Sequence, residues 1–105
     1  MKNKELLIYS FYKFKSIDNK KSLKLFLDDY FKDKIIRGTI LLADEGINAS
    51  ISGKSEDLLE SIKIIKRKIK VRKLDIKINE NDFLPFNRMK VRLKKEIVSL
   101  GQKKI

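Results

Sequence analysis

The chain contains no cysteine and no histidine. Without these side chains it can form no disulfide, no zinc site with thiolate or imidazole ligands, and no Cys- or His-based catalytic centre. Carboxylates, lysines, tyrosines and backbone dipoles are the chemical groups that remain. We therefore do not expect this chain to be catalytic on its own, and we expect it to carry no cofactor and no metal.

Long apolar runs and a leader-like start are also lacking. No window approaches the roughly 18 consecutive apolar residues of a membrane span, and nothing after residues 1–7 resembles a signal-peptide cleavage site. With 105 residues, of which 42% are hydrophobic and 38% charged, the composition indicates one folded domain with a heavily solvated surface. A cytoplasmic location without membrane contact is the default expectation.

Acidic residues are fewer than basic ones. The chain has 14 Asp and Glu and 26 Lys and Arg, which gives a net charge of +12. Such a charge attracts polyanions, nucleic acid first and anionic membrane surfaces second. The 21 Lys, 5 Arg and 15 Ile are equally typical of an AT-rich genome. The total charge therefore does not distinguish a polyanion-binding protein from a compositional bias. Only the arrangement of the cations can distinguish them.

Residues 37–53 predict a hairpin at the centre of the fold. Thr39–Ala43 is a short apolar run, typical of a strand buried on both faces, and Ile47–Gly53 alternates apolar with polar residues. Asp44-Glu45-Gly46 between them suits a turn that ends in a left-handed glycine.

Other strand and helix patterns flank this hairpin. A strand is expected at 6–14, a helix begins after Asp18 or Asn19, a second helix opens at Ser55, and an alternating run covers 74–79. The expected buried stripes are Leu23, Phe26, Leu27 and Tyr30 in the first helix and Leu58, Ile62, Ile65 and Ile69 in the second. This order predicts an α+β, ferredoxin-like (acylphosphatase-like) split βαβ sandwich, an antiparallel sheet with both helices on one face.

The first strand is rich in aromatic residues, and two interpretations of them are open. Tyr9 and Phe11 share one face of the strand, and Tyr12 and Phe14 share the other. Aromatic side chains on a strand can stack nucleic-acid bases. We favour packing in the core and at the edge, since no matching aromatics occur in Ile47–Gly53.

Beyond these six elements the sequence predicts one extra, basic strand. Met89, Val91 and Leu93 alternate there with cations, and same-face neighbours on a strand lie roughly 6.5–7 Å apart, close to the spacing of phosphates. We favour RNA binding by these cations over a merely solvated edge on which lysines prevent unwanted pairing. The RNA-binding candidates are Arg88, Lys90, Arg92 and Lys94.

Two segments resemble signatures of one family. Gly-Thr-Ile-Leu-Leu-Ala-Asp-Glu-Gly-Ile-Asn at 38–48 and Pro-Phe-Asn-Arg-Met-Lys-Val-Arg-Leu-Lys-Lys-Glu-Ile-Val-Ser-Leu-Gly at 85–101 look like motifs of the rhodanese-domain tRNA uridine hydroxylases. Two departures occur: Ala49-Ser50 stands where Gly-Thr is usual, and Ser99 replaces a Thr. Ala49 puts in doubt any role there that needs the freedom of glycine.

The resemblance implies that residues 1–105 are the N-terminal, ferredoxin-like domain of such an enzyme, with a rhodanese domain that bears the catalytic cysteine expected downstream. The full-length relatives make 5-hydroxyuridine at the wobble position of tRNA, using oxygen. The implied function is that of an accessory tRNA-binding domain, with tRNA and the rhodanese domain as its partners. The alternative is an intramolecular docking domain without RNA affinity. Its expected contact patch is Phe83, Leu84, Phe86, Ile97 and Val98.

The motif loop supplies a second set of candidate residues, Glu45, Gly46 and Asn48. Glu45 could hold a loop or pair with Arg88 or Arg92, and Asn48 could bond to backbone or a base edge. Shaping the turn and docking the next domain is an equally good interpretation. Independent acylphosphatase-like catalysis is disfavoured, because residues 13–19 hold neither the Gly of a phosphate-binding loop nor a partner Arg.

Overall fold

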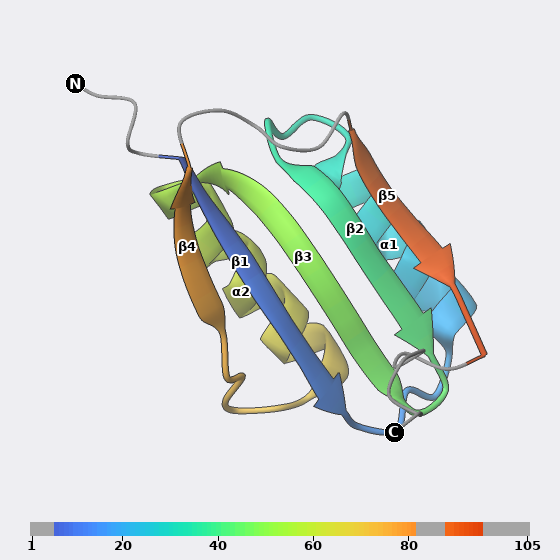
Figure 1. The fold of residues 1–105 in the computed structure, drawn as a ribbon. Helices are drawn as coiled ribbons and strands as arrows, with labels where there is room; N and C mark the ends of the chain where they lie inside the picture. The colour runs from blue at the N-terminus through green and yellow to red at the C-terminus, as the bar shows by residue number, and fades with distance from the viewer. Residues whose placement is uncertain (1–5, 82–87, 96–105) are drawn as a thin grey trace.

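The structure, a computed structural model, describes residues 6–81 and 88–95, which form one sheet with two helices on one of its faces (Figure 1). The elements in chain order are β1 (Leu6–Phe14), α1 (Lys20–Phe31), β2 (Arg37–Ala43), β3 (Gly46–Lys54), α2 (Ser55–Ile69), β4 (Lys77–Asn81) and β5 (Met89–Leu93). The strand order is β4-β1-β3-β2-β5. The predicted α+β split βαβ sandwich and its extra strand are confirmed.

The fifth strand makes the sheet mixed. The first four strands pair antiparallel, but β5 pairs parallel to β2, so the expectation of an antiparallel sheet holds for four strands only. Register explains this direction: β4 ends beside Leu6, at the end of the sheet where β2 begins. A strand that leaves this end and lies beside β2 must run the same way as β2.

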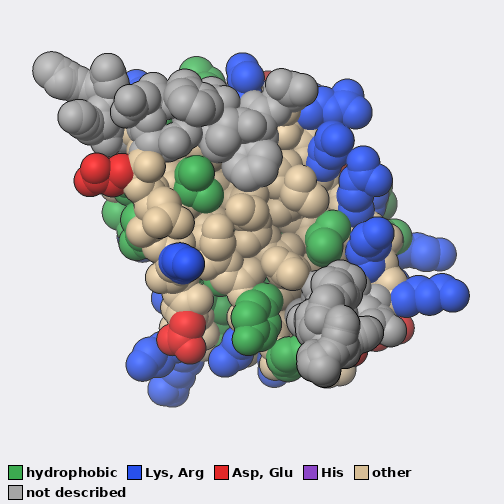
Figure 2. Space-filling view, in the orientation of Figure 1, with side chains coloured by type: hydrophobic (Ala, Val, Ile, Leu, Met, Phe, Trp, Pro, Cys, Tyr) green, Lys and Arg blue, Asp and Glu red, His purple; other side chains and the backbone are tan. Residues whose placement is uncertain are grey.

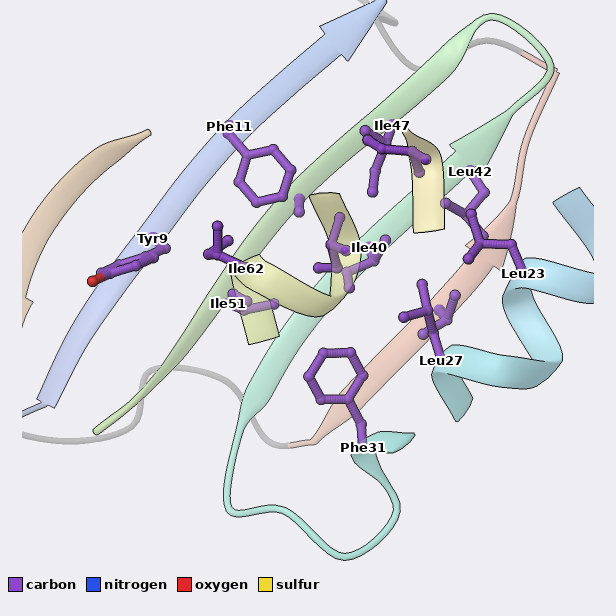
Figure 3. Close-up of a cluster of buried hydrophobic side chains, with 14 of the residues drawn as sticks. Tyr9, Phe11, Leu23, Leu27, Phe31, Ile40, Leu42, Ile47, Ile51 and Ile62 are labelled. Carbon is purple, nitrogen blue, oxygen red and sulfur yellow. The ribbon is translucent and has the colours of Figure 1, made fainter. Parts of the chain in front are cut away.

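The core lies between the sheet and the two helices. Figure 3 shows Tyr9, Phe11, Ile40 and Ile51 of the sheet gathered with Leu27 and other helix residues, and all of them are buried. The predicted stripe of α2 is confirmed in full. The buried residues of α1 are Leu23, Leu27 and Phe31.

The expected buried stripe of α1 was therefore wrong for Phe26 and held in part for Tyr30, which packs against the core. Phe26 is 36% exposed and Tyr30 is only partly buried. Their rings stack on each other with centroids 6.4 Å apart, and the Lys68 ammonium of α2 lies 4.1 Å from the Phe26 ring centroid. Phe26 thus contacts α2, and Tyr30 stacks beside it, while Phe31 is the aromatic residue of α1 that is buried in the core. Neither helix in the described ranges is long and apolar enough to cross a membrane.

The other face of the sheet, which we call the open face, is covered by neither helix (Figure 1). Strand alternation and register determine which side chains share it. It carries Ser10, Tyr12 and Phe14 from β1, Asn48 and Ser50 from β3, Thr39 and Leu41 from β2, and Lys90 and Arg92 from β5.

The first helix begins with a side-chain cap that gives a testable prediction. The Asn19 Oδ1 accepts a 3.0 Å hydrogen bond from the Ser22 amide, which decides between the two expected caps. We expect Asn19→Ala to lower the free energy of unfolding by about 1 kcal/mol. Asp18→Ala, the matched control, should change it by less than about 0.5 kcal/mol. Urea unfolding monitored by circular dichroism measures both, and equal effects would contradict the assignment of the cap.

Candidate nucleic-acid interface

Of the candidate RNA-binding residues, Lys90 and Arg92 lie on β5, and Arg88 and Lys94 directly precede and follow it. The ladder between β5 and β2 holds this strand in place. The Gly38 amide donates to the Arg88 carbonyl oxygen at 3.0 Å, and the Lys94 amide donates to the Leu42 carbonyl oxygen at 2.8 Å. Val91 is buried and lies in register with Ile40, on the helix side. Since strand residues alternate, Lys90 and Arg92 point to the opposite side, whereas Arg88 lines a hollow with Asp28 and Phe31 of α1.

The structure brings the four cations together on one edge. We call Arg88, Lys90, Arg92 and Lys94 the basic edge; Lys90 is half-buried and the other three are exposed. Figure 2 looks onto the open face and shows Lys and Arg side chains gathered along the margin where β5 runs in Figure 1. Within residues 6–81 and 88–95, the ion pairs are Lys20–Asp44 and Lys24–Asp28. Neither of them includes a member of the basic edge, whose contact with RNA stays a prediction.

The motif loop closes the hairpin more tightly than expected. Ala43 pairs directly with Gly46, which leaves Asp44 and Glu45 as a two-residue loop. Gly46 has the expected positive φ, at 156°, but it is paired in the sheet on both sides, so the expected bulge was wrong. A Cβ at Gly46 would overlap the carbonyl oxygen of Lys13 on the neighbouring strand. Glycine is required here by this close approach.

The same loop positions the segment between β1 and α1. The Glu45 carbonyl oxygen accepts from the Lys15 amide at 2.9 Å, and the Asp44 carbonyl oxygen accepts from the Ile17 amide at 3.0 Å. These two amides are therefore not free to bind a phosphate, which agrees with the sequence argument against acylphosphatase-like catalysis. The motif loop acts here through its backbone.

The remaining expectations for the motif differ in outcome. The register places Arg88 beside Gly38, at the opposite end of β2 from Glu45 and roughly 20 Å away, so the expected pairing with Arg88 was wrong, while pairing with Arg92 stays a prediction. Asn48 is half-buried on the open face, level with Tyr12 and Leu41. Ala49, the departure from the family motif, is buried in the core, level with Phe11. The docking patch at Phe83, Leu84, Phe86, Ile97 and Val98 lies outside the described residues.

The aromatic residues of β1 serve two different surfaces. Tyr9 and Phe11 are buried, as favoured from the sequence, but Tyr12 is 60% exposed and Phe14 58% exposed. The Tyr12 and Phe14 rings meet edge to face with centroids 6.0 Å apart. The core interpretation was wrong for these two residues. The alternation of the strand could have indicated their exposure, since it placed Tyr12 and Phe14 on the face of Ser10, opposite to Tyr9 and Phe11.

A split βαβ sheet with two helices on one face, extended by a parallel fifth strand, defines an acylphosphatase-like α+β domain. The family model described as the UPF0176 acylphosphatase-like domain matches residues 6–97, and the chain belongs to this family.

Curated relatives carry one common name. The chain is 45% identical over 95 residues to a protein of Pelagibacter ubique named tRNA uridine(34) hydroxylase, covering 90% of this chain and 32% of the relative. It is 41% identical over 101 residues to a protein of the same name from Rickettsia massiliae, covering 94% of this chain and 40% of the relative. The chain thus spans 32% to 40% of the length of these relatives.

Two solved structures share the fold. BlrP1 BLUF superposes with a TM-score of 0.68 at 14% identity, over 87% of this chain and 65% of that one. Full-length HypF, in a phosphate- and nucleotide-bound form, superposes with a TM-score of 0.58 at 14% identity, over 89% of this chain and 13% of that one. At such identities these structures support the fold alone.

Proposed function

We propose that this chain is the tRNA-contacting domain of an enzyme that hydroxylates the wobble uridine of tRNA, and that the reacting thiol lies in another, rhodanese part of the enzyme. The observation that carries the proposal is the basic edge, four cations on and directly beside β5 that form no ion pair with any described acidic residue. The relatives named tRNA uridine(34) hydroxylase supply the substrate class. The chain's lack of cysteine and histidine fits a binding role.

The physical contribution of the basic edge is positional. Cations roughly 6.5–7 Å apart along a strand match successive phosphates of an RNA backbone. Each phosphate neutralised releases condensed counterions, which favours binding at low salt. Such contacts fix the position of the RNA without reading its sequence. The domain would hold tRNA against the part of the enzyme that performs the chemistry.

A pair of matched charge-reversal variants tests this proposal. Lys90→Glu/Arg92→Glu changes the basic edge, and Lys63→Glu/Arg67→Glu makes the same change in net charge on an exposed part of α2. We expect the first variant to bind an unmodified tRNA transcript roughly 10- to 100-fold more weakly and to lower the slope of log affinity against log salt by about 2. The α2 variant should lose only a few-fold. Filter binding or fluorescence anisotropy across a salt series measures both.

Two results would contradict the proposal. Equal losses in both variants would mean that net charge attracts the RNA and that the arrangement of β5 has no role. Absence of salt-dependent tRNA binding by the unaltered chain would favour the alternative, a domain that docks onto the rest of the enzyme and does not contact RNA.

A further inference from the structure

We propose that the open face binds unpaired nucleotides, with a base stacked on Tyr12 and the flanking phosphates on the basic edge. This inference rests on the proposed function and adds to it the kind of RNA and the surface that receives the bases. Tyr12 combines a ring that is 60% exposed with a position on the same face of the sheet as Lys90 and Arg92. Bases that are not held in a duplex are free to stack on such a ring.

The register places the two halves of this site in one row. Tyr12 is paired with Asn48, Asn48 with Leu41, and Leu41 with Arg92. Three strand spacings separate β1 from β5, which is roughly 14 Å at the usual distance between strands. About two nucleotides of a single strand span this distance, so one segment of RNA lying across the strands can reach both Arg92 and Tyr12.

The side chains between Tyr12 and the basic edge are uncharged, and apart from Leu41 they are short. The next row across the sheet runs Ser10, Ser50, Thr39 and Lys90, and the Ser10 and Ser50 hydroxyl oxygens lie 3.2 Å apart. Along the described lengths of β1, β3, β2 and β5, no open-face position carries Asp or Glu. Figure 2 shows this area as mainly uncharged polar side chains and backbone, with acidic side chains only toward the margin. Short side chains leave room for planar bases, and the lack of carboxylates avoids repulsion of the backbone.

A shallow hollow lies directly beside Tyr12. Its volume is ≈ 530 Å³, within the range of small-molecule sites. Its open-face lining is Ser10, Tyr12, Asn48 and Ser50, and Asp75 and Lys77 stand at its edge. Asp75 and Lys77 carry opposite charges, so the lining has no net attraction for a phosphate, and the Asp75 carboxylate can accept a hydrogen bond from the N–H group of a base. The hollow thus suits the base end of the RNA and the basic edge suits the phosphate end.

The Tyr12 ring is held in place for this role. The Phe14 ring meets it edge to face, with centroids 6.0 Å apart, an arrangement that stabilises aromatic pairs. A ring that is already oriented loses little conformational freedom when a base stacks on it. The relatives are named for uridine 34, a nucleotide of the anticodon loop, and loop nucleotides are the kind whose bases can be splayed onto a protein surface.

The first test compares a single-stranded oligouridylate of about ten nucleotides with a blunt RNA duplex of equal charge. We expect Tyr12→Ala to weaken binding of the oligouridylate roughly 5- to 100-fold while the salt slope stays unchanged, because stacking releases no counterions. Binding of the duplex should not change. Tyr12→Phe should restore most of the affinity, and Leu25→Ala, which truncates an exposed residue of α1, should have no effect.

A fluorescence measurement answers the same question without truncating the ring. The chain contains no tryptophan, so Tyr12→Trp introduces a single probe on the open face. We expect its emission to be quenched when the oligouridylate binds, because the base covers the indole. Leu25→Trp, 69% exposed on α1 as Leu, should not be quenched. The outcome decides the proposal even if Tyr12→Ala fails to fold.

The results separate this inference from the proposed function. If Lys90→Glu/Arg92→Glu lowers oligouridylate affinity but Tyr12→Ala does not, and the Tyr12→Trp emission stays constant, the stacking site is refuted and the phosphate contacts stand. Loss of affinity for the duplex in Tyr12→Ala, equal to the loss for the single strand, would also refute it. If neither the charge reversal nor Tyr12→Ala has an effect, both proposals fail.

Discussion

Gly46→Ala is expected to lower the free energy of unfolding by about 3 kcal/mol or more, since it combines an unfavourable backbone angle with a collision against the backbone. Gly46 has a φ of 156°, and a Cβ there would overlap the Lys13 carbonyl oxygen and crowd the Phe14 Cα. The collision could be relieved only if β1 moved away from β3, its partner in the middle of the sheet. For a domain of this size the midpoint of thermal unfolding should fall by roughly 10–20 °C, measured by circular dichroism.

Ala43→Gly provides the control for this substitution. Ala43 is the strand partner of Gly46. The control therefore removes one methyl group at the level of the hairpin where Gly46→Ala adds one. It should cost about 1 kcal/mol through backbone entropy. If Gly46→Ala costs no more than Ala43→Gly, the hairpin has room for a side chain, and the requirement for glycine is refuted.

Local pattern was enough to predict the elements that pack through a single face. In α2 the residues at Leu58, Ile62, Ile65 and Ile69 bury together as predicted, because helical spacing alone decides which of them share a face. The alternation in β3 likewise put Ile47 and Ile51 in the core. These predictions needed no knowledge of what lies opposite.

Predictions failed where packing partners decide between similar residues. Phe26 and Phe31 are both apolar residues of α1, and only the position of α2 makes Phe26 a lateral contact while Phe31 faces the sheet. The alternating run at 74–79 was expected to be a strand, but β4 begins at Lys77 and Leu74 packs partly buried ahead of it. Tertiary contacts override a pattern of this length.

The candidate site was likewise predictable only where the pattern within a single strand decides which side chains share a face. Alternation placed Lys90 and Arg92 on one side of β5, but alternation cannot give the neighbour or direction of a strand. The parallel pairing with β2 brings Arg92 level with Tyr12 on one face. The role of the Asp44 and Glu45 carbonyl oxygens was also beyond prediction, since the backbone of any sequence carries the same groups.

Val91→Lys tests whether the arrangement of the cations, and not their number, determines RNA binding. Val91 is 5% exposed beneath the basic edge, on the helix side of β5. A lysine ammonium cannot stay in this core without an acidic partner, so we expect β5 to detach from β2 at a cost of about 3 kcal/mol or more. Although the variant gains one positive charge, its affinity for tRNA should fall by roughly tenfold, because the phosphate contacts proposed for the basic edge would be lost together.

Amide hydrogen exchange shows whether detachment is the cause. The Gly38 and Lys94 amides bond across the β2–β5 ladder, so they should exchange faster in Val91→Lys, while amides between β1 and β3 keep their protection. Leu59→Lys adds the same charge at a residue of α2 that is 51% exposed, and it should leave tRNA affinity and exchange almost unchanged. If Val91→Lys instead binds tRNA more tightly, total charge controls binding, and the ladder that aligns Arg88 to Lys94 contributes nothing to it.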